Sequence, residues 1–397
     1  MNILLLFGIT LLTTVLMSFL FVKFKLPQVI GHILVGILLG VSGFKLYDVT
    51  DISNLSMVTY FALAMIGFTI GGELRWARLK RFGKSILVIT FFESSVSCLF
   101  VFTAVYLLSS NLPLSLLLGG LACATAPGGT TNVIQEYKAR GKLTSTLYGV
   151  VGADDALAII FFAILSGVSK ILIGVTDTIE PLTIIFHIVY DIGGALLLGL
   201  GLGLIISIWM LKIHSSEVRH LITLISIFLC AGISVSMEVS LILSSMVMGI
   251  IIANIRPHRS RSCFLSLQHI SVPLYMLFFV LIGARLDVSH LFTMGSVGAV
   301  YFLFRLFGKY FGAFFGAFAA NAPSVVRKNI GLCLFSQAGV AIGLALSVDM
   351  EFQKYNLEAQ QLGASIVTII TASTLIFQII GPMMTKHALV KANETHV

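Results

Sequence analysis

The stretch Gly149-Val-Val-Gly-Ala-Asp154-Asp155-Ala-Leu-Ala-Ile-Ile160 places two adjacent carboxylates in the middle of a long apolar run. Neighbouring positions on a helix point about 100° apart, so the two acids cannot serve one small ligand equally. We expect one acid to hold a salt bridge and the other to face a water-filled path. A carboxyl group far from bulk water can hold either a proton or a cation near neutral pH, which is the minimal chemistry for exchanging the two.

The alternative interpretation is that this acid pair lies at a helix end. Asp154 follows Lys142, the last basic residue before the run, by about twelve residues, or about 18 Å along a helix. This distance places both acids deep in the apolar layer and favours a position in mid-membrane.

The whole chain has the composition of a membrane protein. Of its 397 residues 57% are hydrophobic and 11% charged, and the mean hydropathy is +1.02. A soluble domain carries roughly a quarter charged residues. The net charge of +8 does not lie on a soluble module, so nucleic-acid binding is not indicated. The five scattered cysteines form no CxxC motif, which favours neither a metal cluster nor a disulfide framework.

Apolar runs between polar breaks predict an all-α polytopic protein with about thirteen spans in one domain over residues 1–385, followed by a short cytoplasmic tail over 386–397. The first run has no basic n-region and no cleavage pattern, so we expect a retained span and not a signal peptide. The runs are 2–22, 27–43, 55–72, 85–109, 113–135, 143–169, 181–211, 219–236, 240–255, 267–284, 291–320, 328–348 and 361–385.

The basic residues predict the orientation of these spans. Loops after the odd-numbered runs, together with the C-terminal tail, hold 19 of the 25 lysines and arginines, whereas loops after the even-numbered runs hold 4. Because cytoplasmic loops are enriched in basic residues, we expect the N-terminus outside and the C-terminus in the cytoplasm.

Six charged residues fall inside the apolar runs, where a charge costs about 3 kcal/mol and tends to face a cavity and find a partner. They are Glu93, Asp154, Asp155, Asp191, Arg305 and Lys309. Arg305 lies one turn from Lys309 on the same helix face, and Glu93 is its candidate partner. Whether the spans of Arg305 and Glu93 are neighbours cannot be read from the sequence.

Lys309 lies about twelve residues before the cytoplasmic break at Asn321, so it reaches a depth similar to that of Asp154 from the same side. A lysine beside a carboxylate offsets the cost of burying both groups. We therefore favour an Asp154–Lys309 pair, with Asp155 as the site for the cation and the proton. A lysine that snorkels to the membrane surface is the alternative.

Two spans contain helix breaks. The fifth reads Cys123-Ala-Thr125-Ala-Pro127-Gly128-Gly129-Thr130-Thr131-Asn132, and the twelfth carries the weaker signal Leu334-Phe-Ser336-Gln337-Ala-Gly339. A break in mid-membrane is tolerated where it lines a cavity, and the oxygens of Thr130, Thr131 and Asn132 suit a small cation. The two spans enter from opposite sides, which predicts an inverted repeat with two crossing broken helices. A plain proline kink is the alternative for the fifth span.

These residues resemble those of the monovalent cation:proton antiporter-2 family, the bacterial branch of the sodium/proton exchangers. The matching segments are Leu26-Pro27-Gln-Val-Ile-Gly31-His-Ile-Leu-Val-Gly36, Thr125-Ala-Pro127, Ala153-Asp154-Asp155, Arg305-Leu-Phe-Gly308-Lys309 and Ser336-Gln337-Ala-Gly339. The resemblance covers nearly the whole chain, and the Asp-Asp pair with its downstream lysine is its specific part.

The resemblance implies thirteen spans arranged as a dimerisation bundle and a core bundle that moves like an elevator. It implies that the second acid, Asp155, binds the monovalent cation and that Asp154 pairs with the lysine. It also implies a homodimer in the bacterial inner membrane, surrounded by lipid, with transported sodium or potassium and protons and with no cofactor.

The chain departs from this family in three respects. The break in the fifth span is richer in glycine than usual, which leaves the ion selectivity open. Glu93 is an additional acid in mid-span. Many relatives carry a cytosolic nucleotide-binding domain, which this sequence lacks, so regulation of that kind would need a separate subunit.

The leading functional prediction is electrogenic sodium/proton or potassium/proton exchange, because a titrating lysine supplies an extra proton in each cycle. The alternative is a sodium-coupled symporter of an organic anion on the same scaffold, which would need a roomy apolar pocket and anion-binding helix ends. A potassium channel is disfavoured because no TVGYG-like filter appears. An enzyme is disfavoured because no nucleophile and base form a recognisable set.

Overall fold

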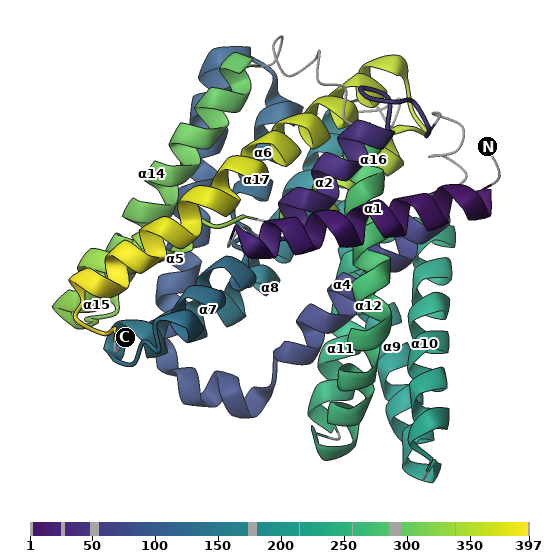
Figure 1. The fold of residues 1–397 in the computed structure, drawn as a ribbon, viewed down its shortest axis with the longest axis horizontal. Coiled ribbons are helices and arrows are strands. Elements are labelled where there is room, and N and C mark those ends of the chain that lie inside the picture. Colours follow the sequence, from purple (N-terminus) through teal and green to yellow (C-terminus); the bar gives the residue numbers. More distant parts are fainter. Residues whose placement is uncertain are drawn as a thin grey trace. The chain divides into compact units, whose positions relative to one another are not determined.

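The computed structural model describes residues 3–24, 28–47, 55–173, 181–213, 215–255, 257–285, 295–337 and 339–395 of the chain (Figure 1). All the regular elements in these residues are helices, and no strand occurs among them. The prediction of an all-α membrane protein is therefore confirmed.

The chain divides into two compact units, each assembled from two separate parts of the sequence. Unit 1 comprises Met1–Trp76 and Glu180–Ser289. Its helices are α1 (Ile3–Lys23), α2 (Gln28–Leu39), α4 (Ser56–Glu73), α9 (Pro181–Lys212), α10 (Ser216–Ser236), α11 (Leu241–Ile255) and α12 (Pro257–Arg285).

Unit 2 comprises Ala77–Ile179 and His290–Val397. It contains every intramembrane charge that the sequence predicts except Asp191. Its elements are α5 (Trp76–Ser109), α6 (Leu112–Ala122), α7 (Pro127–Glu136), α8 (Lys142–Leu172), α14 (Gly295–Ala319), α15 (Ser324–Asn329), the 3-10 helix η1 (Ile330–Leu334), α16 (Gly339–Phe352) and α17 (Leu357–Lys391).

The helices of the described residues have the lengths that a bilayer requires. Eight are long and apolar enough to cross a membrane, and the pair Ser324–Leu334 with Gly339–Phe352 forms a ninth, bent candidate. Four shorter apolar helices complete the set: Gln28–Leu39, Leu112–Ala122, Leu241–Ile255 and Ile270–Arg285. Together these helices occupy the thirteen predicted runs, so the chain is a multi-pass membrane protein.

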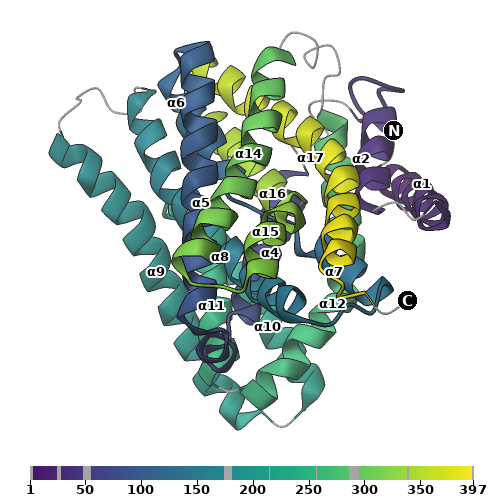
Figure 2. The same ribbon diagram turned by 90° about the vertical axis from the view of Figure 1, so that its left-hand side faces the viewer.

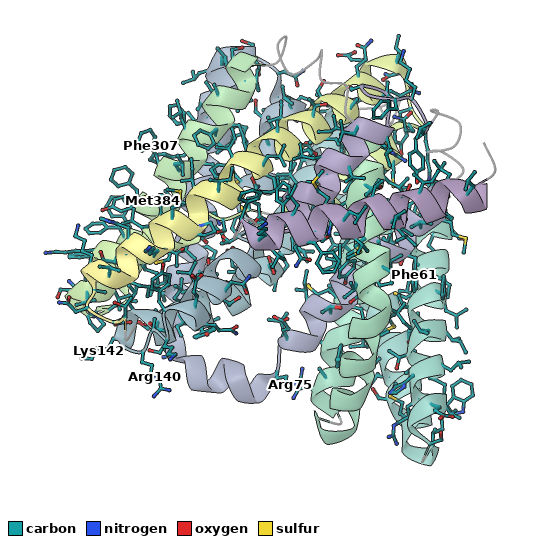
Figure 3. The ribbon with its side chains drawn as sticks, viewed as in Figure 1. Phe61, Arg75, Arg140, Lys142, Phe307 and Met384 are labelled. Carbon is teal, nitrogen blue, oxygen red and sulfur yellow. The ribbon has the colours of Figure 1, made fainter. Side chains whose placement is uncertain are left out.

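The outward-facing side chains agree with a lipid environment. Phe19, Leu107 and Leu197 are 71, 78 and 71% exposed, which in water would be costly. On α14, Phe307 is half exposed and projects away from the neighbouring helices (Figure 3). Tyr301, Arg305 and Lys309 of the same helix are buried.

Two local features determine where the spanning part of α5 and helix α6 begin. Gly83 has a φ of 70°, which favours glycine, and it separates a short first segment from the membrane-spanning part of α5. Asn111 caps α6 by accepting a hydrogen bond from the amide of Leu114 at 2.9 Å, and Pro113 occupies the first turn.

The C-terminal segment differs from the predicted tail. Helix α17 continues to Lys391, so residues 386–391 are helical. Ala388 and Leu389 are buried in an apolar cluster with Leu143 and Leu147 of α8. Contact with this cluster extends the helix beyond the apolar run that the sequence indicated.

Candidate functional site

The two broken helices cross in unit 2, as the sequence predicts. The first break separates α6 from α7, and the second separates η1 from α16. At the crossing the amide of Ala126 donates to the carbonyl oxygen of Ser336 at 2.9 Å. The hydroxyl of Thr130 donates to the carbonyl oxygen of Cys333 at 3.0 Å. Each break therefore supplies partners for backbone groups that the other leaves without a helical hydrogen bond.

Arg305 of α14 joins both breaks. Its guanidinium donates to the carbonyl oxygens of Ala124 at 2.7 Å and Phe335 at 2.9 Å, and it lies 3.5 Å from the carbonyl oxygen of Ser336. Its other face lies 4.4 Å from the ring centroid of Phe377. The side chain is fully buried. Arg305 thus neutralises the partially negative carbonyl ends of two broken helices at once.

Close packing of α14 on α5 brings the charged residues together. Gly308, Gly312 and Gly316 recur at every fourth position and face α5, which runs beside α14 (Figure 2). A Cβ atom at Gly308 would lie 2.6 Å from the Cα atom of Ser97, and one at Gly312 would lie 2.8 Å from the Cα atom of Glu93. Such a stripe of small residues lets two membrane helices approach backbone to backbone.

Lys309 lies at the centre of the site. Its ammonium group contacts a carboxylate oxygen of Glu93 and the carbonyl oxygen of Cys123, and it donates to the hydroxyl of Thr125 at 2.8 Å. These three partners match the three donors of an ammonium group. The Oδ2 atom of Asp154 lies 3.5 Å from the same nitrogen, so Asp154 forms a second, longer ion pair with Lys309.

The pairing of the charges therefore differs from the simplest prediction. The Asp154–Lys309 contact is present, but the nearer acid is Glu93, which the sequence analysis considered as a partner of Arg305. Arg305 donates hydrogen bonds to backbone carbonyl oxygens and does not pair with Glu93. The physical reason is the glycine stripe of α14, which places Lys309 and not Arg305 against α5 at the level of Glu93.

The two acids of α8 are both buried. Asp154 is fully buried and Asp155 is 7% exposed. The hydroxyl of Ser94 lies 3.1 Å from Oδ1 of Asp154 and 3.3 Å from Oε2 of Glu93, and its single proton can serve one of them at a time. Ser94 therefore connects the two acids that surround Lys309.

The charges of this site do not balance. Of the six charged residues that the sequence places in mid-membrane, three buried carboxyl groups and two buried basic groups belong to unit 2, and with all five ionised one negative charge remains. They are Glu93, Asp154, Asp155, Arg305 and Lys309. A net charge held away from water is costly, so one proton or one monovalent cation would lower the free energy of the site.

The remaining predicted residues of the first helix break differ in their burial. Thr131 is half buried and Asn132 is exposed, while Gly129 packs against Ser336, with an added Cβ only 2.6 Å from that hydroxyl. For Pro127 and Gly128 only the helical backbone is described.

Other predicted features lie at the second break, in the N-terminal motif and in unit 1. Gly339 begins α16. Leu26 and Pro27 of the N-terminal motif lie outside the described residues. Asp191 lies in unit 1, where its Oδ1 atom accepts a hydrogen bond from the amide of Ser240 at 2.7 Å.

Two functional groups, the hydroxyl of Tyr301 and the backbone carbonyl of Cys123, were not singled out from the sequence. Gln337 donates to the carbonyl oxygen of Leu121 at 3.2 Å and to the hydroxyl of Tyr301 at 2.8 Å, and Tyr301 is fully buried on α14. Tyr301, Arg305 and Gly308 are spaced at three and four residues, so helical periodicity was the available signal. The backbone carbonyl of Cys123 carries no sequence signal of its own.

Comparison with known proteins identifies the family to which the chain is similar. A family model described as sodium/hydrogen exchanger, transmembrane, matches residues 9–389. The chain is 22% identical over 277 residues to the ammonium/H(+) antiporter subunit AmhT of Alkalihalophilus pseudofirmus, with 68% of each chain covered. It is 27% identical over 322 residues to the iron transporter MagA of Paramagnetospirillum magneticum, with 76% of this chain and 68% of that protein covered.

Solved structures give the same fold. The sodium proton antiporter MjNhaP1 from Methanocaldococcus jannaschii, solved at pH 8, superposes with a TM-score of 0.81 and 18% identity, covering 98% of this chain and 99% of that one. An electron-microscopy map of the same antiporter gives a TM-score of 0.77 and 17% identity, with 98% of each chain covered. At these identities the likeness establishes the architecture.

Proposed function

The chain belongs to the sodium/hydrogen exchanger family and is a multi-pass cation:proton antiporter, and within that function we propose that it exchanges sodium or potassium for protons at Asp155. Asp154 and Lys309 form the charged surroundings of that site. Arg305 holds the crossing of the broken helices in place.

The observation that carries this proposal is that three buried acids accompany two buried basic residues in the mid-membrane set of unit 2, which leaves one negative charge when all five are ionised. One proton or one monovalent cation restores neutrality, whereas a divalent cation would leave an excess of positive charge. Because the two ions neutralise the same charge, the site holds one or the other, and this competition is the basis of exchange.

Asp155 suits the exchanging role better than its neighbours. Glu93 and Asp154 both face the ammonium group of Lys309 and share the hydroxyl of Ser94. Asp155 is the more exposed of the two acids on α8, at 7% against 0% for Asp154. We assign the cation to Asp155, with Thr130, Thr131 and Asn132 as further oxygen ligands in the transporting state.

Exchange is proposed to be electrogenic. Binding of a cation at Asp155 adds positive charge near Lys309 and therefore opposes the positive charge of its ammonium group. A second proton would then leave for each cation that binds. Solid-supported-membrane recording tests this. We expect cation addition to produce a current in the wild type. A protein that exchanges cations for protons without producing a current would contradict electrogenic exchange.

The mechanism is proposed to be of the elevator type. All residues of the ion site come from unit 2, so unit 2 can carry the site as a rigid body, while unit 1 supplies the dimerisation surface of a homodimer. The proposed location is the bacterial inner membrane, with the N-terminus outside and the C-terminus in the cytoplasm, because 19 of 25 basic residues then fall on the cytoplasmic side.

The choice of cation is left to experiment. The names of the relatives include ammonium and iron. Ammonium is a monovalent cation and satisfies the same charge balance as potassium, so it belongs in the test beside sodium and potassium. Ferrous iron does not satisfy that balance.

The decisive experiment measures dissipation of a pH gradient in proteoliposomes on addition of each chloride salt. We expect the wild type to respond to at least one monovalent cation and Asp155→Asn to lose the response by at least about a hundredfold, because the neutral side chain cannot exchange a proton. Asp191→Asn removes a buried carboxyl group outside the site and serves as the control. Intact activity in Asp155→Asn would overturn the assignment.

A further inference from the structure

The C-terminal segment ends on the helix that carries the two acids. Both carboxylate oxygens of Glu394 accept backbone hydrogen bonds at the start of α8: Oε1 from the amide of Leu143 and Oε2 from the amide of Thr144, each at 2.8 Å. The hydroxyl of Thr144 donates to Oε2 at 2.7 Å, and the amide of Arg140 donates to the Glu394 carbonyl oxygen at 2.9 Å. We call residues 392–394 the C-terminal latch.

The latch is buried and tightly fitted. Glu394 is 7% exposed, although it lies only a few residues beyond the end of α17. A Cβ atom added to Gly141 would lie 2.1 Å from the carboxyl carbon of Glu394, so glycine leaves the space that the carboxylate occupies. Asn393 adopts a φ of 54°, which turns the chain from α17 toward α8. The loop that it meets, with Arg140 and Lys142, is labelled in Figure 3.

The bond pattern is stronger than an ordinary helix cap. A free helix N-terminus presents amides without partners and a partial positive charge. A carboxylate that accepts two of these amides neutralises both, and charged acceptors form roughly twice as strong a hydrogen bond as neutral ones. No side chain of the preceding loop caps α8, since Gly141 precedes its first residue. A residue about 250 positions later in the chain supplies the cap.

The start of α8 is coupled to the ion site through one rigid helix. Leu143, Leu147, Val150 and Val151 of α8 lie in the same apolar cluster as Leu389 of α17. Asp154 follows Leu143 by eleven residues on the uninterrupted helix, or about 16 Å. A change in the tilt or the rotation of the first turn would therefore move Asp154 relative to Lys309 and Ser94.

We propose that Glu394 is a positioning residue for the ion site: its carboxylate fixes the first turn of α8 and thereby the orientation in which the acids of that helix meet the site. It does not touch the ion. The inference rests on the proposed function in one respect, since it takes the acids of α8 as the exchange site. The existence of the latch is independent of that function.

Two variants displace the latch by different means. Glu394→Gln keeps the shape of the side chain but turns one acceptor into a donor group that faces a backbone amide. Gly141→Ala keeps the carboxylate and displaces it, because the new methyl group occupies its position and the flexible end of Glu394 can swing out. Glu358→Gln is the matched control: it removes the same charge from an exposed position in the first turn of α17, where Asn356 already caps the helix.

Hydrogen exchange of the purified protein tests the latch without any transport assay. We expect the amides of residues 143 and 144 to exchange on the order of tenfold faster in Glu394→Gln and in Gly141→Ala than in the wild type and Glu358→Gln. Unchanged exchange rates in both variants would overturn the latch.

Proton release from proteoliposomes, driven by whichever of sodium, potassium and ammonium gives the largest wild-type response, tests the positioning role. We expect both variants to raise the half-saturating concentration of that cation by about fivefold, the size of effect expected from loss of a helix cap, with the maximal rate per folded protein within about twofold of the wild type. Faster amide exchange with an unchanged half-saturating concentration would show a purely structural cap and overturn the proposal. A wild type without any response, but with protected amides, would instead count against the proposed function.

Discussion

Units 1 and 2 each bury acidic side chains in the membrane, but they do so in different ways. In unit 1 the carboxylate of Asp191 accepts a hydrogen bond from the amide of Ser240, the residue that precedes α11. In unit 2 three acids lie in one helical bundle with two basic side chains, and their charges do not cancel. An acid that accepts a backbone amide can thus serve a helix end, whereas a cluster with an odd charge favours the binding of a mobile ion.

This difference shows that depth in the membrane does not by itself identify a transport residue. All six intramembrane charges had the same sequence signal. Asp191 accepts a hydrogen bond from a backbone amide, whereas Glu93 and Asp154 lie within salt-bridge distance of Lys309. Substitutions in unit 2 should therefore have larger effects than the corresponding substitution in unit 1.

The largest effect is expected for Lys309→Gln in unit 2. Removing the ammonium group leaves Glu93 and Asp154 facing each other without compensation, which costs about 3 to 5 kcal/mol of stability and should abolish charge movement. Thermal unfolding in detergent and current recording measure the two effects. The double variant Lys309→Gln with Glu93→Gln should recover most of the lost stability. No recovery would show that the two residues do not form a unit.

A smaller effect is expected for Gly312→Leu, which leaves every charge in place. Its side chain would enter the contact with the backbone of Glu93, so α5 and α14 must separate and the Lys309–Glu93 contact must lengthen. We expect a loss of about 2 kcal/mol in unfolding free energy and a clear loss of transport. Gly298→Leu is the control on the same helix, because no atom lies within 4 Å of a Cβ added there. Equal losses in both variants would remove close packing as the cause.

The smallest effect is expected for Asp191→Asn in unit 1. The amide oxygen of asparagine still accepts the hydrogen bond from Ser240, so stability should change by less than about 1 kcal/mol and exchange should continue at the wild-type rate. Transport measurements in proteoliposomes check this. A loss as large as that of Asp155→Asn would erase the distinction between the two units.

The depth of the charged residues in the membrane and the positions of the helix breaks could be predicted from the sequence. Runs of apolar residues located the spans, and Pro127 with its glycines located the first break, because both are local signals. The crossing itself followed from the opposite entry of the two spans and appears in the Ala126–Ser336 hydrogen bond.

The choice of partners could not be obtained in the same way. The Lys309–Glu93 contact depends on which helices are neighbours, and a single sequence does not encode that adjacency directly. The glycine spacing of α14 was a usable signal for a close neighbour, although it does not name α5. The contact of Glu394 with α8 joins residues about 250 positions apart and has no local signal at all.

The central claim is that a proton and a monovalent cation compete for the one negative charge left by the five mid-membrane charged groups of unit 2. The most direct test is the half-saturating cation concentration of the reconstituted protein, measured at several pH values from the initial rate of proton release. Competition of the cation with the proton at Asp155 predicts a rise of at least about tenfold for each unit of acidification on the acid side of the profile, and a steeper rise where the second proton is also released. A half-saturating concentration that stays constant as the pH falls would contradict the account.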